Sequence, residues 1–196
     1  KEVKAQWRQI SEADKPRYHW TEIVAADGTR KLYGLTALHI ITKDLPNWFW
    51  ATFEHVDNVK RAGNEPWKLK SRDTFACGRD ASGCGRAPRG IRLEGTVWAN
   101  YRLRGTQTEF TDSAGIPVRL ANSEPEEGFQ ETASCMTCHS RSTVAADGSR
   151  LPVFTADEQG FVGTPDPEWF ADGAKRKFTQ LDFIWAMIRA KPKKTH

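Results

Sequence analysis

The sequence predicts an α+β fold in which an antiparallel β-sheet is followed by two helices. The sheet is indicated by short runs over residues 1–120 in which apolar and polar side chains alternate between turn residues. The helices are indicated by two stretches, 123–138 and 179–190, where capping residues precede apolar positions at helical spacing. We therefore expect one domain over residues 1–196, mostly β over 1–120 and helix, loop and helix over 121–196.

Tight turns are expected to connect the strands. Asp27-Gly28 predicts a hairpin between a strand over Glu22–Ala25 and a longer strand over Arg30–Thr42. The turn at Asp44–Pro46 leads into a strand over Trp48–Val56, which is rich in aromatic and β-branched residues. Further along, we expect strand character over residues 90–112, a stretch that pairs back over 113–122, and little regular structure over 57–90.

Two capping patterns predict the helices. Ser123-Glu124-Pro125-Glu126 reads as a capping box, with Ser123 as the N-cap, and predicts a helix from about Glu124 through Cys138. Thr179-Gln180-Leu181-Asp182 similarly predicts a helix over "LDFIWAMIRA" near the end of the chain. The residues between these helices, from about 140 to 170, are typical of a long loop.

Composition indicates a folded globular chain. Its 196 residues are 38% hydrophobic and include eight Trp and ten Phe, which is enough for a packed core. No apolar run reaches the roughly 20 residues that cross a bilayer as a helix, so we expect no membrane span. The net charge is +4, but the positive residues are scattered apart from the tail "RAKPKKTH", so we expect no nucleic-acid binding.

The stretch "SCMTCHS", from Ser134 to Ser140, carries the strongest chemical signal. Cys135 and Cys138 lie three positions apart on a helical turn, so both thiols can point the same way and each add across a haem vinyl group. His139 follows directly and can serve as the proximal iron ligand. A disulfide redox motif needs no such histidine, and a zinc site would need a second ligand pair at short spacing. We therefore expect one covalently attached haem c, wrapped by the loop that follows.

The other two cysteines, Cys77 and Cys84, flank a glycine-rich hexapeptide. The spacing favours a local disulfide that closes a surface loop, and the alternative of a metal site lacks further ligands nearby. Covalent haem attachment takes place outside the reducing cytosol, so we expect an exported, periplasmic protein. The chain begins at Lys1 without Met and without a signal-peptide pattern, which fits a processed or trimmed sequence.

A second protein ligand would decide whether the distal position of the iron is occupied by a side chain or open to a small molecule. A register centred on Asp44–Pro46 sets His39 opposite Ala51 and His55 opposite Leu35, so that both imidazoles share one apolar face. A slip of one residue would separate them. We favour His39 as the distal ligand and His55 next, and an open site remains an alternative. The less suited candidates are Met187, which resembles core filler, the motif's own Met136, His19 and the terminal His196.

Four stretches together resemble a family of bacterial monohaem c-type cytochromes: "LTALHIITKDLPNWFWATFEHVDN", "NYRLRGTQ", "VRLANSEPEEGFQETASCMTCHS" and "LDFIWAMIRA". The resemblance implies a single covalent haem, export and a redox role, and it favours His39 and His55 because both lie in the first stretch. A looser similarity, at the level of architecture, is to cytochrome P460 and the β-sheet cytochromes c′, which also place a sheet before a late CxxCH motif and leave the distal iron site open.

These observations favour a one-electron carrier that exchanges electrons with a redox partner protein. The alternative is a haem enzyme or gas-binding protein with an open distal site, acting on peroxide, nitric oxide or hydroxylamine. A third possibility is a binding module presented by the sheet, with the haem as a structural anchor. A homodimer formed through an exposed sheet edge is a further expectation.

Overall fold

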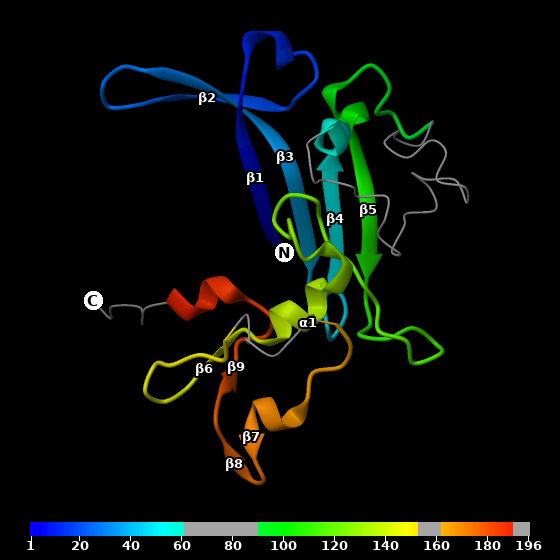
Figure 1. The fold of residues 1–196 in the computed structure, drawn as a ribbon, viewed down its shortest axis with the longest axis vertical. Helices are drawn as coiled ribbons and strands as arrows, with labels where there is room; N and C mark the ends of the chain where they lie inside the picture. The colour runs from blue at the N-terminus through cyan, green and yellow to red at the C-terminus, as the bar shows by residue number, and fades with distance from the viewer. Residues whose placement is uncertain (61–89, 153–161, 190–196) are drawn as a thin grey trace.

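The computed structural model describes residues 1–60, 90–152 and 162–189, and an antiparallel sheet of five strands forms its frame (Figure 1). The strands are β1 (Glu2–Ile10), β2 (Trp20–Val24), β3 (Arg30–Thr42), β4 (Phe49–His55) and β5 (Tyr101–Gln107). Their order is β1-β3-β4-β5. β2 pairs with the first part of β3, and β4 pairs with the last part of β3 along the same edge. The long strand β3 therefore organises the sheet.

The predicted hairpin is confirmed. Gly28 has a φ of 83°, a conformation that suits glycine, and the turn brings Val24 opposite Arg30. β3 ends at Thr42 as the pattern predicts, whereas β2 begins at Trp20, ahead of the predicted start. Strand β4 also lies within its predicted range. Local turn chemistry therefore locates these strands correctly.

The predicted register between β3 and β4 is wrong by one residue. His39 lies opposite Thr52, and Ala37 lies opposite Glu54. The turn is wider than its Asp44–Pro46 centre indicates: the Trp48 amide donates to the Leu45 carbonyl, and Trp48 itself has a φ of 64°. His39 consequently shares a face with Trp50, Thr52 and Glu54, while His55 belongs to the alternate set of β4 side chains.

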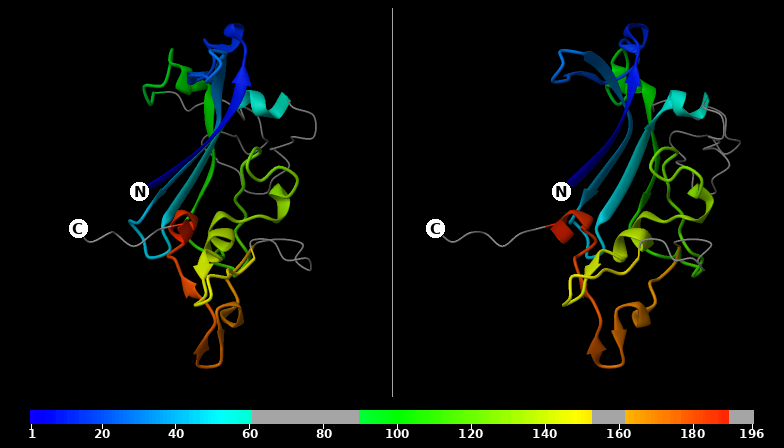
Figure 2. Two further views of the ribbon diagram at one scale, coloured as in Figure 1. Left: turned by 90° about the vertical axis from the view of Figure 1, so that its left-hand side faces the viewer. Right: turned by 60° about the vertical axis from the view of Figure 1, so that its left-hand side comes forward.

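The segment from Leu120 to Ser134 crosses the inner face of the sheet, as both views of Figure 2 show. The Asn122 amide donates to the Thr52 hydroxyl and to the Phe53 carbonyl, both at 2.8 Å. The Ser123 amide donates to Glu54, whose carboxylate also accepts from Arg102 at 2.8 Å. Polar side chains buried in the sheet therefore fix the path of this segment.

The first predicted helix is mostly absent. Residues 124–134 form turns with a short 3-10 turn, and the one α-helix of the described residues is α1 (Cys135–Ser140). Glu126 accepts from the Asn122 amide at 2.7 Å, so the expected capping box at Ser123 does not form. Gly128, with a φ of 90°, turns the chain away from helical geometry. Side-chain partners and one glycine override the local pattern.

The predicted C-terminal α-helix is also wrong within the described residues. Its expected capping residues Thr179–Gln180 form strand β9, and the 3-10 turn η7 (Trp185–Arg189) replaces the helix. Asp182 and Phe183 between them have φ angles of 49° and 68°, which no helix accommodates. The described fold is therefore mostly β rather than α+β.

Two small sheets of two strands each lie beyond the lower end of the main sheet in Figure 1. β6 (Thr143–Val144) pairs with β9 (Thr179–Gln180), and β7 (Ala171–Asp172) pairs with β8 (Lys175–Arg176). The other 3-10 turns are η1 (Glu12–Asp14), η2 (Val56–Lys60), η4 (Val97–Asn100), η5 (Gln130–Thr132) and η6 (Pro167–Trp169). The stretch expected to pair back near residue 113 does so through a bridge between Thr111 and Pro117.

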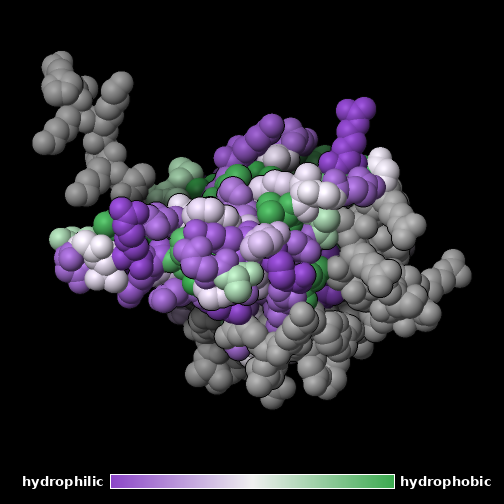
Figure 3. All heavy atoms as spheres, turned by 90° about the horizontal axis from the view of Figure 1, so that it is seen from above, coloured by the Kyte–Doolittle hydropathy of each residue, from purple (hydrophilic) through white to green (hydrophobic). Residues whose placement is uncertain are grey.

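The surface is largely polar where Figure 3 shows it. Seen from above, the described residues are mostly hydrophilic, with apolar side chains scattered among them. Edge strand β1 has exposed apolar side chains at Val3 and Trp7, and β2 has them at Ile23 and Val24. Among the described residues, no helix is both long and apolar enough to span a membrane.

Candidate functional site

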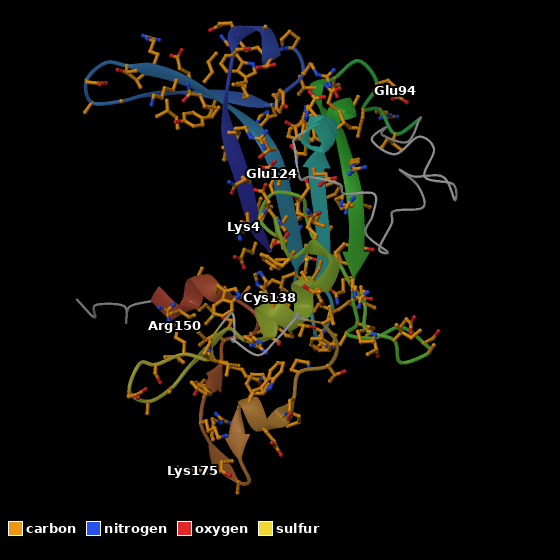
Figure 4. All side chains as sticks on the ribbon, viewed as in Figure 1. Lys4, Glu94, Glu124, Cys138, Arg150 and Lys175 are labelled. Carbon is orange, nitrogen blue, oxygen red and sulfur yellow. The ribbon has the colours of Figure 1, made fainter. Side chains whose placement is uncertain are left out.

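A cavity of about 290 Å³ lies where α1 meets the inner face of the sheet. The sheet contributes His39, Ile41 and Trp50, and the crossing segment contributes Leu120 and Phe129. From α1 come Cys135, Cys138 and His139, and the lining also includes Trp185 and the charged residues Glu2, Lys4 and Glu126. Figure 4 labels Lys4 on β1 and Cys138 on α1, the two elements that lie on either side of the cavity.

Helix α1 is held in place by its own first turn and by β5. The Ser134 hydroxyl accepts from the Thr137 amide, which makes Ser134 the N-cap. Gln107 donates to the same hydroxyl at 2.8 Å and accepts from the Met136 amide at 3.2 Å. Met136 is buried in a core cluster with Ile41, Trp48 and Trp50, and it does not line the cavity. The two cysteines and His139 consequently face the cavity while Met136 anchors the helix.

Both motif thiols are free, and both cysteines are partly buried. Burial raises the pKa of Cys138 to about 11 and that of Cys135 well above its ordinary value. The Cys135 thiol donates a hydrogen bond to the Leu120 carbonyl at 3.4 Å. Reactive cysteines of disulfide-exchange proteins have lowered pKa values, because the thiolate is the nucleophile. Neutral thiols with raised pKa values therefore disfavour that chemistry here.

A backbone carbonyl fixes the orientation and the tautomer of His139. Its Nδ1 lies 2.8 Å from the Phe183 carbonyl, and since a carbonyl can only accept, Nδ1 carries the proton. Nε2 is then the nitrogen with a free lone pair. Burial lowers the pKa of His139 to about 4, despite the opposing effect of the Phe183 bond, so the ring is neutral at pH 7. Trp50 packs edge-on against it, with ring centroids 4.7 Å apart.

His39 reaches the same cavity from β3. Its Nε2 is buried and has no hydrogen-bond partner among the described residues. Burial, with smaller effects of Lys4 and His139, lowers its pKa to about 4, so this ring is also neutral. Leaving a buried polar atom unpaired costs about 1–3 kcal/mol. A metal-bound lone pair would remove that cost, and the donor set of two neutral imidazoles and two thiols fits a covalently attached haem.

His55 lies elsewhere and is fully engaged. Its Nε2 is 3.1 Å from the Arg17 carbonyl, and its Nδ1 accepts from the Asp57 amide at 3.1 Å. The ring stacks on Tyr18 with centroids 3.7 Å apart. The expectation that His39 and His55 share a face is therefore wrong, because the register shift separates them.

The remaining candidates are also away from the cavity or outside the described residues. Met187 is 49% exposed, so it is not placed as a core residue. His19 is exposed between the rings of Trp7 and Trp98. The predicted disulfide partners Cys77 and Cys84, and the terminal His196, lie outside the described residues. Of the second-ligand candidates the structure describes, His39 alone lines the cavity.

Sequence reasoning assigned no part in the site to Glu126, Trp50 and Phe183. The sequence predicts Glu126 in a helix cap, but it lines the cavity, and burial raises its pKa to about 7 against the effect of the Asn122 amide. Trp50 would have been found by the correct register, because it lies next to His39 on the sheet face. Phe183 acts through its backbone carbonyl, which leaves no side-chain signal in the sequence.

Comparisons with known proteins add no assignment. No protein-family model matches the chain, and no curated protein or solved structure does. Within residues 1–60, 90–152 and 162–189, no three His, Cys, Asp or Glu side chains gather as ligands for a metal ion. The resemblance to c-type cytochromes therefore stays a prediction based on the motif.

Proposed function

We propose that this chain is an exported monohaem c-type cytochrome that carries single electrons between redox proteins. The observation that carries the proposal is the meeting of two neutral histidines, His39 and His139, with Cys135 and Cys138 at one cavity. These residues come from β3 and from α1, far apart in the sequence, so local spacing alone does not bring them together.

The roles of the residues follow from their chemistry. Cys135 and Cys138 would hold the haem by two thioether bonds, His139 would bind the iron through Nε2, and His39 would bind it from the sheet. Trp50, Leu120 and Phe129 would exclude water, and Lys4 offers a cation to a propionate. The chemistry that a haem supplies when bound is a one-electron change between Fe(III) and Fe(II), with a reduced protein as donor and an oxidised one as acceptor. With His139 and His39 both on the iron, no position would remain for a substrate, which suits a carrier.

The test is to produce the chain in a bacterial periplasm that attaches haem to CxxCH motifs. We expect one haem per chain that survives denaturing electrophoresis, and a ferrous spectrum of low-spin type that carbon monoxide leaves unchanged. Absence of covalent haem under conditions that mature a known c-type cytochrome would refute the proposal.

A second candidate function is a haem enzyme or gas-binding protein with an open distal site. The observation that favours it is Glu126, a carboxyl at the same cavity with a pKa of about 7. A group with this pKa can give and take protons at neutral pH, as chemistry on peroxide or hydroxylamine requires. In this case His39 would be a distal residue rather than a ligand. A high-spin ferrous spectrum that shifts with carbon monoxide would decide for this candidate.

A further inference from the structure

The turn between β9 and η7 has an unusual backbone. Asp182 and Phe183 are consecutive residues with φ angles of 49° and 68°, in the left-handed region that non-glycine residues seldom adopt. The turn is fixed on both sides, because the Leu181 amide donates to the Ser142 carbonyl at 2.8 Å and the Ile184 amide donates to the Leu181 carbonyl at 2.9 Å. Strain of this kind persists only where neighbouring contacts hold it, and it is enriched at functional sites.

The strained turn delivers one group to the site. It places the Phe183 carbonyl 2.8 Å from His139 Nδ1, across 44 positions of sequence. The Phe183 ring packs against Trp50 and Phe110, with centroid distances of 5.9 and 6.3 Å. Both the backbone and the side chain of Phe183 are therefore held in place. The orientation of the imidazole therefore depends on the conformation of this turn.

Lys43 ties the turn to the sheet. From the loop between β3 and β4, its ammonium donates to the Asp182 carboxylate at 2.6 Å and to the Pro46 carbonyl at 2.8 Å. It also lies 5.4 Å from the centroid of the Trp48 ring. The Lys43 and Asp182 side chains are 44% and 53% exposed, and exposed ion pairs contribute little to the stability of a fold. The Lys43–Asp182 contact can therefore fix the geometry of the turn, although it adds little to the stability of the fold.

We propose that Lys43 is a positioning residue that, through Asp182, holds the Phe183 carbonyl on His139 and so sets the strength of His139 as an iron ligand. The inference rests on the proposed function and extends it. A hydrogen bond from Nδ1–H to a carbonyl fixes the ring and raises the basicity of Nε2. A more basic ligand favours Fe(III), so loss of the bond should raise the reduction potential.

The test uses the haem-loaded protein and the variant Lys43→Ala. We expect the midpoint potential to rise, and the His139 Nδ1 proton to exchange with deuterated solvent several-fold faster by proton NMR, because the hydrogen bond that holds it is weakened. Lys43→Arg, which keeps the cation, should restore both values. Arg30→Ala is the matched control, because it removes an ion pair to Glu22 of the same length, 2.6 Å, away from the site.

Unchanged potential and unchanged proton exchange in a folded Lys43→Ala protein would overturn the inference. If that variant does not fold, Asp182→Ala removes the same contact from the other side and takes its place. A wild-type chain that carries no covalent haem would instead refute the proposed function. The two failures are therefore told apart by the wild-type protein alone.

Discussion

The two halves of the sheet each hold a histidine with a buried ring nitrogen, and the surroundings of the two rings differ. At the upper end in Figure 1, His55 has both nitrogens bonded to the backbone and its ring stacked on Tyr18. Towards the lower end, His39 lines a cavity with its Nε2 unpaired among the described residues. Folding alone satisfies the first ring and leaves the second unsatisfied. A buried ring of the first kind stabilises a fold, and one of the second kind is suited to a ligand.

The largest expected effect is the loss of covalent haem at the lower end of the sheet, where the two motif cysteines lie. Replacing both motif cysteines, Cys135→Ala with Cys138→Ala, should abolish covalent haem completely, because no thioether can form. Haem staining after denaturing electrophoresis measures this. Met136→Leu is the control from the same helix, since it keeps an apolar side chain in the core and Met136 itself does not line the cavity. A double variant that still retains covalent haem would contradict the proposal that Cys135 and Cys138 attach it.

The variant His39→Ala distinguishes an electron carrier, in which His39 binds the iron, from a haem enzyme or gas-binding protein with an open distal site. If His39 closes the iron, its removal should convert a protein that ignores carbon monoxide into one that binds it, with a shift of the ferrous spectrum to the carbonyl form. Reversal by added imidazole would show that an empty position, rather than a general disturbance, is the cause. A variant that stays low-spin and insensitive to carbon monoxide would assign the distal position to another residue.

The sequence predicts local features of this molecule well. Asp27-Gly28 locates a hairpin because a short turn depends on neighbours only, and CxxCH brings three site residues together within one helical turn. His39 was also found, but partly through a wrong register. The shift arises at Trp48, whose left-handed backbone nothing in the apolar pattern shows.

Non-local contacts account for what the sequence did not predict. The helix expected before Cys135 is replaced because Asn122 and Ser123 bond to the sheet and Glu126 bonds to Asn122. The expected C-terminal helix gives way to β9 and a strained turn that bonds to His139. Partners distant in sequence decide each of these cases, and propensity has little weight against them.

The pH dependence of stability tests the burial of the two cavity histidines. In the haem-free double-cysteine variant, burial holds the pKa values of His39 and His139 at about 4, against 6.5 in an unfolded chain. Between these values the unfolded state binds more protons, so stability is full above about pH 7 and falls as the pH drops to 4. At about 1.4 kcal/mol per pKa unit, the loss is on the order of 5 kcal/mol for both rings together.

Urea unfolding at pH 7, 5.5 and 4 measures this loss. His39→Gln keeps a polar side chain of similar length but cannot titrate, so it should remove about half of the pH dependence while leaving the His139 part. A haem-free protein whose stability is the same at pH 7 and pH 4 would show that the two rings are not held neutral by burial.

The smallest expected effect tests the upper half. His55→Ala should lower the free energy of unfolding by roughly 3 kcal/mol, because it removes a buried stacked ring and leaves the Arg17 carbonyl and the Asp57 amide without that partner. His19→Ala, which truncates an exposed ring, should change it by less than about 0.5 kcal/mol. Urea unfolding of the haem-loaded proteins gives both values. The iron spectrum should be the same in both variants as in the wild type, since neither ring lines the cavity. A His55→Ala protein with normal stability and an altered iron spectrum would reverse the roles of the two histidines.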